Sequence, residues 1–195
     1  SIRRQRQMCI RDSYIHCIKK MNGISIFKND LALPLFFFQD NWIKEKDFKK
    51  LSKKNKSHAL FYASVLPNES NVKFENALNA DDTIKLQNLG LLLEQAKILQ
   101  QSKITTKYFS NNKIILDVQL DKPTILQTTI PFHKGWSVLV DGKLISPFIA
   151  NGGLLAFNLV KGDKQIVLEF KPTDLKLGLI VTLIFFLAFI IIIYE

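Results

Sequence analysis

The C-terminal end of the chain carries the feature that most constrains it. Residues 177–194 read LGLIVTLIFFLAFIIIIY, without one charged side chain. A helix of about 20 residues crosses a hydrocarbon core of about 30 Å, and it satisfies its own backbone hydrogen bonds there. The run therefore predicts a transmembrane helix over residues 174–195. The alternative is a buried helix or strand of a soluble core, but such helices seldom lack a polar face over this length.

The N-terminal end differs in composition from the rest. All arginines lie within residues 1–13, and every later basic residue is a lysine. The segment SIRRQRQMCIRDS resembles translated sequencing-adapter read-through, so we predict that it is non-native sequence and set it aside. The alternative is a native basic arm that binds anionic lipid or nucleic acid.

The formal net charge is +10, which raises the question of a nucleic-acid partner. The lysines after residue 13 are dispersed along the chain. They form no basic stripe with interleaved aromatic residues of the kind that holds a phosphate backbone. We therefore expect no nucleic-acid partner.

The part before residue 104 reads as mixed short strands and helices. Residues 24–38 are apolar around a turn at Asn29-Asp30, which predicts two extended stretches. A helix with Asp40 or Asn41 as its cap is predicted from the helical spacing of Trp42, Ile43, Phe48 and Leu51. A second short helix would carry Ala59, Leu60 and Ala63.

A polar segment separates these helices from a third one. Residues 67–83 read as loop around one short strand near residues 72–74. Residues 88–102 then predict a helix whose buried stripe consists of Leu92, Leu93, Ala96 and Leu99.

From residue 104 onward the apolar period changes from 3.6 to 2, which is typical of strands. Asp141-Gly142 predicts a two-residue hairpin, because a type I′ turn needs positive φ at both central residues. Lys161-Gly162-Asp163 fits a slightly longer hairpin. Further strands are predicted at 114–120, 124–130, 136–140, 143–149, 154–160 and 164–171.

Short strands at this spacing favour an antiparallel β-sandwich. The predicted fold class is therefore α+β, with a jelly-roll-like antiparallel β-sandwich, a few short helices and one C-terminal transmembrane helix. The predicted organisation is non-native sequence at 1–13, a mixed helix and strand part at 14–103, the sandwich at 104–173 and the membrane helix at 174–195.

No catalytic constellation is recognisable in the sequence. His16, His58 and His133 are widely separated and have no metal-ligand spacing. The sequence contains no Gly-rich phosphate loop, nucleophile elbow or zinc-binding helix motif. We therefore name no catalytic residue and no metal ligand, and we expect no cofactor.

One cluster, residues 131–143, has two interpretations. In the structural one, Gly135 allows a sharp turn into a strand, Trp136 packs on the sheet, and Asp141-Gly142 closes a hairpin. In the functional one, His133, Trp136 and Asp141 form a glycan-contact surface, because aromatic rings stack on sugars and carboxylates accept sugar hydroxyls. Both stay open at this point.

Several short motifs together resemble the C-terminal end of the YfhO family of bacterial membrane proteins. The similarity extends over about residues 24–193, with departures at His133 and at Asp163-Lys164. The motifs, in order, are Phe132-His133-Lys134-Gly135-Trp136, Val140-Asp141-Gly142-Lys143, Asn151-Gly152-Gly153, Lys161-Gly162-Asp163-Lys164-Gln165-Ile166, and Pro172 leading into Leu177-Gly178-Leu179-Ile180.

The resemblance implies a fragment of a large polytopic glycosyltransferase with a C-type fold. Such a protein takes sugar from a polyprenyl-phosphate donor and modifies envelope glycopolymers. Its acidic catalytic residue lies in an early extracytoplasmic loop, so the catalytic part would be absent from this chain. The alternative is a non-enzymatic, membrane-anchored β-sandwich that binds glycan or a partner protein.

The resemblance also implies a location. The globular part would lie outside the bacterial cell membrane and the last helix within the lipid bilayer. Lys171 and Lys176 precede the apolar run, so a simple positive-inside count favours the opposite orientation. Long domains translocate largely regardless of charge, and we therefore expect the extracytoplasmic one.

Overall fold

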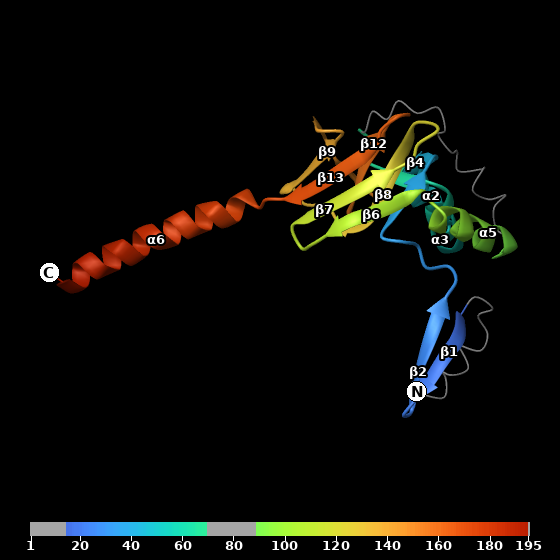
Figure 1. The fold of residues 1–195 in the computed structure, drawn as a ribbon, viewed down its shortest axis with the longest axis horizontal. Helices are drawn as coiled ribbons and strands as arrows, with labels where there is room; N and C mark the ends of the chain where they lie inside the picture. Colours follow the sequence, from blue (N-terminus) through green and yellow to red (C-terminus); the bar gives the residue numbers. More distant parts are fainter. Residues whose placement is uncertain (1–14, 70–88, 195) are drawn as a thin grey trace.

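The computed structural model describes residues 15–69 and 89–194, and most of them form antiparallel sheets (Figure 1). Two sheets pack face to face. The first has the strand order β10-β9-β13-β7-β6 and the second the order β11-β12-β8-β3. The five-stranded sheet comprises β6 (Ile104–Phe109), β7 (Lys113–Val118), β9 (Trp136–Val140), β10 (Lys143–Ile145) and β13 (Gln165–Phe170). The four-stranded sheet comprises β3 (Phe36–Gln39), β8 (Thr124–Pro131), β11 (Phe148–Ala150) and β12 (Leu154–Leu159). The α+β class with a β-sandwich is thus confirmed.

The core between the two sheets follows from strand alternation. Along β7 every second residue is buried, as the period of 2 predicted. These side chains meet inward residues of the other sheet, with Phe157 fully buried among them. The cluster consists of Phe36, Ile114, Leu116, Val118, Leu126, Val138, Val140, Leu155, Phe157, Leu159, Ile166 and Leu168.

The hairpin at Asp141-Gly142 is confirmed, with φ of 47° and 79°. The single strand predicted over 143–149 is wrong. The chain forms β10 in one sheet and β11 in the other, with Pro147 between them. Proline cannot donate to a ladder, which suits a crossing point between sheets.

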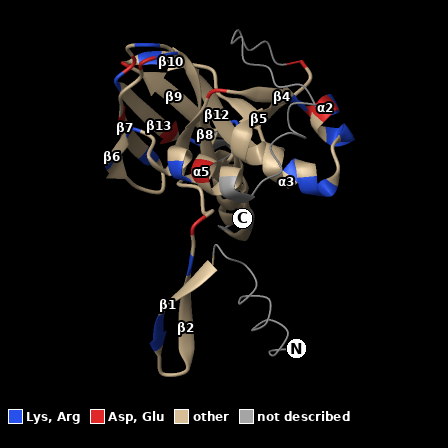
Figure 2. Ribbon diagram, turned by 90° about the vertical axis from the view of Figure 1, so that its right-hand side faces the viewer, with Lys and Arg blue, Asp and Glu red and all other residues tan. Residues whose placement is uncertain are grey.

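A third layer covers the outer face of the four-stranded sheet. The parallel strands β4 (Trp42–Lys44) and β5 (Ser64–Leu66) lie there, beside α2 (Glu45–Lys50), α3 (Lys53–Tyr62) and α5 (Leu89–Gln100). Within this layer, Ile43, Leu51, Ala59, Ala63 and Val65 form their own core. Figure 2 shows α2, α3, β4 and β5 together on one side of the globular part.

The first predicted helix is only partly correct. Trp42 and Ile43 belong to β4, so the helix begins later, after Lys44, which makes no side-chain cap. The predicted cap at Asp40 or Asn41 is therefore wrong. Asn41 instead donates from its side chain to the carbonyl of Tyr62 at 3.1 Å.

The third predicted helix is confirmed as α5. Leu92, Ala96 and Leu99 are buried as expected, whereas Leu93 is half-buried. The strand predicted near residues 72–74 and the segment 1–13 lie outside the described residues.

Hydrogen bonds join the third layer to the sandwich. The hydroxyl of Ser64 donates to Oε1 of Gln127 at 3.1 Å, and both residues are fully buried. The backbone N–H of Val65 donates to Oδ1 of Asn151 at 2.7 Å. The N–H of Asn151 in turn donates to the carbonyl of Val65 at 2.8 Å.

Replacing Asn151 should destabilise the fold through both its amide and its backbone. Asn151→Gly keeps the positive φ of 50° accessible but leaves the N–H of Val65 without its acceptor, at a cost of about 1 to 3 kcal/mol. Asn151→Ala loses the same bond and adds about 1 kcal/mol of left-handed backbone strain. Urea unfolding of the two variants measures both terms, and equal stabilities would contradict the backbone term.

Two elements project from the body of the molecule (Figure 1). One is the hairpin of β1 (Ile15–Met21) and β2 (Ile24–Asn29), whose Asn22-Gly23 turn has φ of 46° and 81°. The other is α6 (Thr173–Tyr194), which continues from the end of β13. The helix predicted over 174–195 therefore forms.

The predicted membrane-spanning character of that helix is a separate matter. In the part of the chain that the structure describes, no helix combines the length and hydropathy needed to cross a membrane. The described residues thus do not support the prediction of a transmembrane helix at 174–195.

Candidate binding site

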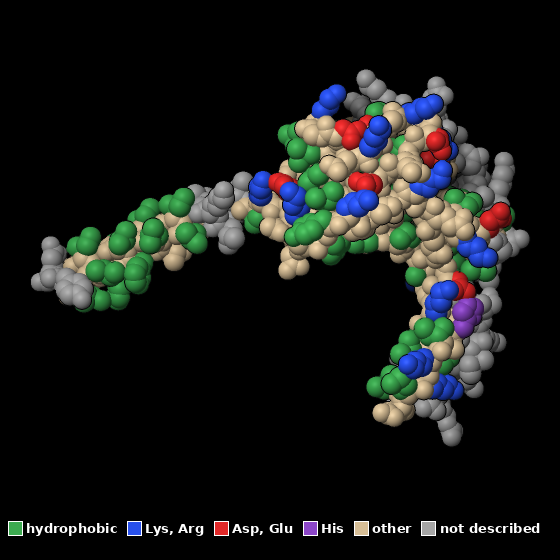
Figure 3. Space-filling model, in the orientation of Figure 1, with side chains coloured by type: hydrophobic (Ala, Val, Ile, Leu, Met, Phe, Trp, Pro, Cys, Tyr) green, Lys and Arg blue, Asp and Glu red, His purple; other side chains and the backbone are tan. Residues whose placement is uncertain are grey.

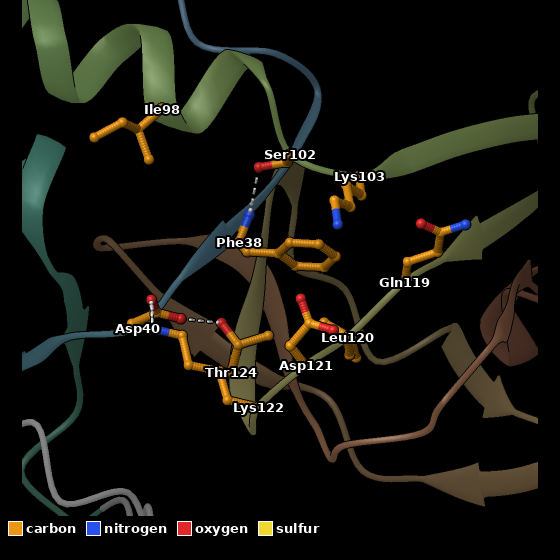
Figure 4. A pocket seen from close by; sticks show the side chains of 10 residues that line it. All are labelled: Phe38, Asp40, Ile98, Ser102, Lys103, Gln119, Leu120, Asp121, Lys122 and Thr124. Carbon is orange, nitrogen blue, oxygen red and sulfur yellow. Dashed lines mark hydrogen bonds and ion pairs between the residues drawn. The ribbon is translucent and has the colours of Figure 1, made fainter.

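A pocket of about 230 Å³ lies beside the β7–β8 loop (Figure 4). It is built where β3, the end of α5 and the β7–β8 loop meet. Figure 4 shows the Phe38 ring between the Ser102-Lys103 segment and the β7–β8 loop. Its lining residues are Phe38, Asp40, Ile98, Ser102, Lys103, Gln119, Leu120, Asp121, Lys122 and Thr124.

Charged side chains hold the pocket's floor in place. Oδ1 of Asp40 accepts from the hydroxyl of Thr124 at 2.9 Å, and Oδ2 lies 2.6 Å from Nζ of Lys122. On the opposite wall, the hydroxyl of Ser102 donates to the carbonyl of Leu99 at 2.8 Å and accepts from the N–H of Phe38 at 3.2 Å. Asp40, Thr124 and Ser102 therefore shape the pocket.

The exposed polar groups of the pocket are those available to a ligand. Lys103, Gln119 and Asp121 are exposed. Together with the half-buried Phe38 ring they offer a cation, an amide, a carboxylate and an apolar face. This combination suits a sugar, whose hydroxyls take polar partners and whose ring face packs on an aromatic side chain.

A shallow groove of about 770 Å³ adjoins the pocket and shares Lys103 and Gln119 with it. Two further lysines, Lys107 and Lys164, line it together with Asp117. Nζ of Lys107 lies 3.3 Å from Oδ2 of Asp117, so one of the lysines is paired. The groove therefore has an excess of positive charge, which favours ligands that carry anionic groups.

The predicted residue Asp141 lies beside this groove. Its carboxylate accepts from the N–H of Gln165 at 2.8 Å and from the N–H of Lys164 at 3.2 Å. Its own N–H donates to the carbonyl of Gln165 at 2.9 Å. Asp141 thus fastens the hairpin to the start of β13.

The predicted residues His133 and Trp136 lie at the other end of β9. The Trp136 ring packs on Phe170 with centroids 5.0 Å apart, and the His133 ring contacts Phe170 edge-on at 5.3 Å. Gly135 is buried between them, and a Cβ there would lie 3.1 Å from both His133 and Phe170. The structure therefore brings His133 and Trp136 together but not with Asp141, and glycan contact by these residues stays a prediction.

A charged cluster lies at the same end as Trp136. Glu169 is 2.6 Å from Nζ of Lys171 and 3.1 Å from Nζ of Lys113. The hydrogen bond from Lys171, followed by that from Lys113, holds the pKa of Glu169 below its usual value.

This lowered pKa gives a testable pH dependence. Because the carboxylate is favoured in the folded state, its stabilising effect is present above the usual Glu pKa of about 4.3 and is lost as pH falls through the lowered value. The melting temperature of the natural chain should exceed that of Glu169→Gln at neutral pH. The difference should vanish in strong acid, and a difference independent of pH would contradict the assignment.

The pocket and the groove offer polar contacts to a ligand. Neither the pocket nor the groove contains a histidine or cysteine among its lining residues. No group of three or more potential metal ligands occurs in the ranges 15–69 and 89–194. Sequence reasoning missed the pocket because its residues come from positions 38 to 124, far apart along the chain.

The globular part is thus a β-rich α+β domain with a pocket between β3, the end of α5 and the β7–β8 loop. The family described as "Bacterial membrane protein YfhO" matches residues 83–182, and the chain belongs to that family. Its assignment to a family of bacterial membrane proteins supports a location at the membrane.

Curated relatives match parts of the chain. It is 26% identical over 109 residues to "Uncharacterized protein YfhO" of Bacillus subtilis, covering 52% of this chain and 13% of the relative. It is 31% identical over 130 residues to "Pre-mRNA-splicing factor RSE1" of Saccharomyces cerevisiae, covering 61% of this chain and 9% of that protein. The chain therefore spans a small part of the length of these relatives. No solved structure matches it significantly.

Proposed function

We propose that the chain is the extracytoplasmic binding domain and a membrane helix of a polytopic glycosyltransferase. The complete protein would transfer sugar from a polyprenyl-phosphate donor to an envelope glycopolymer, with its catalytic residues on segments outside this chain. Membership of the YfhO family supports the membrane setting. The pocket, whose lining offers charged side chains and an aromatic ring, supports a binding role.

In this proposal α6 lies in the lipid bilayer. The helix has 22 residues, which span about 33 Å at 1.5 Å per residue. Its described large apolar side chains are exposed on all sides, with Phe185 at 69% and Ile191 at 62%. Such a surface has no favourable environment in water, whereas hydrocarbon satisfies it.

The observation that carries the binding role is the position of the pocket. The β7–β8 loop, which lines the pocket, lies at the opposite end of the sandwich from α6 (Figure 1), so a bilayer around α6 leaves the pocket far from the lipid surface. A lipid-linked donor stays at that surface. The pocket and its lysine-lined groove therefore fit the acceptor polymer, and the lysines favour one that carries anionic groups.

Lys103→Gln, which changes a lysine shared by the pocket and the groove, should weaken binding of the purified envelope glycopolymer by about 10- to 100-fold, because a charged hydrogen bond contributes about 1.5 to 3 kcal/mol. Titration calorimetry on the detergent-solubilised chain measures it. Lys50→Gln is the matched control, since Lys50 is an exposed lysine of α2 that lines neither the pocket nor the groove. Equal affinities of both variants would overturn the assignment of the pocket.

An experiment on the full-length protein distinguishes an enzyme from a binding module. Loss of sugar from the polymer after deletion of the full-length gene, restored by the natural gene, would support the transferase. Unchanged polymer composition together with retained binding would favour the non-enzymatic, membrane-anchored module.

The side of the membrane on which the globular part lies can be tested separately, by labelling a cysteine. Cys17 is exposed on β1, and Cys9→Ser leaves it as the remaining thiol. A membrane-impermeant maleimide should label Cys17 in intact cells. Labelling only after lysis would place the globular part in the cytoplasm.

A further inference from the structure

Two loops form hydrogen bonds to the residues that directly precede α6. The N–H of Phe170 donates to the carbonyl of Asn112, at the tip of the β6–β7 hairpin, at 2.8 Å. The N–H of Lys171 donates to the carbonyl of Gly135, in the loop before β9, also at 2.8 Å. We call the hairpin tip, this loop and residues 169–171 the α6 root.

The α6 root is basic. Lys113 and Lys171 share the carboxylate of Glu169, and Lys134 adds a further positive charge in the loop. Two lysines thus share one glutamate. Figure 3 shows lysine side chains gathered with an acidic one where α6 leaves the globular part.

Aromatic side chains accompany these lysines. Tyr108 and Phe109 directly precede the hairpin tip and are 50% and 57% exposed. His133 is exposed, and Trp136 is half-buried against Phe170. Aromatic residues flanked by lysines are the composition that membrane–water interfaces favour.

We propose that the α6 root seats the globular domain on the headgroup layer of anionic phospholipids. This inference rests on the proposed location of α6 in the bilayer and adds a second contact to it. Lysines at the root meet the lipid phosphates, and Tyr108 and Phe109 enter the interface beside them. The domain is thereby held upright, with its pocket directed away from the membrane.

The two tryptophans of the chain allow a direct test. Trp136 lies beside the root, whereas Trp42 packs in the layer that covers the far face of the four-stranded sheet. The full chain with Trp42→Phe is reconstituted into vesicles of phosphatidylcholine and phosphatidylglycerol with bromine on the upper part of the acyl chains. Trp136 fluorescence should be quenched, and Trp42 fluorescence in the Trp136→Phe chain should not.

Charge variants test the lipid chemistry. Lys113→Gln with Lys171→Gln should reduce quenching of Trp136 in vesicles with phosphatidylglycerol to the level found in phosphatidylcholine alone. The matched control is Lys143→Gln with Lys161→Gln, two exposed lysines at the opposite end, which should leave quenching unchanged. Circular dichroism confirms that each variant keeps its strands.

The outcomes separate the two claims. A chain that resists alkaline carbonate extraction but shows no quenching of Trp136 overturns the headgroup contact and leaves the anchor. Equal quenching of Trp42 and Trp136 also overturns the contact. A chain released by carbonate overturns the anchor and the contact together.

Discussion

Phe157→Ala is expected to lower the free energy of unfolding by about 3 to 5 kcal/mol. Phe157 lies on β12, is 0% exposed and contacts core residues of both sheets. Its truncation removes a large apolar area and leaves a cavity that the β-sheets around it cannot close, because backbone ladders fix their spacing. Urea unfolding of the detergent-solubilised chain measures the loss.

The neighbouring residue supplies the control. Asn158 is exposed on the same strand, so Asn158→Ala should change stability by no more than about 0.5 kcal/mol. If Phe157→Ala costs no more than Asn158→Ala, the two sheets do not share the core described here.

The burial of the four-stranded sheet shows why the spacing of apolar residues in the sequence could not predict the order of the layers. Its β8 strand is buried continuously from Thr124 to Thr128, since one face meets the sandwich core and the other meets the third layer. A strand buried on both faces loses the alternation of apolar and polar residues. The sequence predicted the strand but contained no local sign of the layer that covers it.

Turns were the most predictable elements because their chemistry is local. Asp141-Gly142 adopts positive φ at both positions, as the type I′ turn requires. The same rule applied to Asn22-Gly23 would have found the β1–β2 hairpin, which sequence reasoning did not identify. The helical spacing of Trp42, Ile43, Phe48 and Leu51 is coincidental. Trp42 and Ile43 instead belong to β4, which pairs with β5.

The candidate site was the least predictable part. His133, Trp136 and Asp141 are close in sequence, but residues 136 and 141 are separated by about 16 Å of extended strand at 3.3 Å per residue. The observed pocket instead joins Phe38 to Asp121 through pairing of β3 with β8. Contacts between such distant positions depend on sheet order, which no short motif encodes.

Replacing Phe185 and Phe186 together by arginine is expected to release the chain from the membrane. Each arginine near the middle of a spanning helix costs about 2.5 to 3.5 kcal/mol, whereas each Leu, Ile, Phe or Val contributes about −0.3 to −0.6 kcal/mol there. Two arginines therefore offset most of the favourable insertion free energy that the remaining apolar residues of α6 contribute. Alkaline carbonate extraction of membranes from expressing cells measures the retained fraction.

The matched control for the double-arginine chain is a double substitution that keeps α6 apolar. Phe185→Leu with Phe186→Leu keeps the apolar surface of α6 and should leave retention unchanged. If the double-arginine chain also stays in the membrane fraction, then α6 does not provide the anchor. Lysine contacts of the α6 root cannot account for retention after carbonate, because alkaline carbonate releases chains that are held by electrostatic headgroup contacts alone. High-salt washing of double-arginine membranes before any carbonate step tests the root separately, because salt removes a chain held by those contacts.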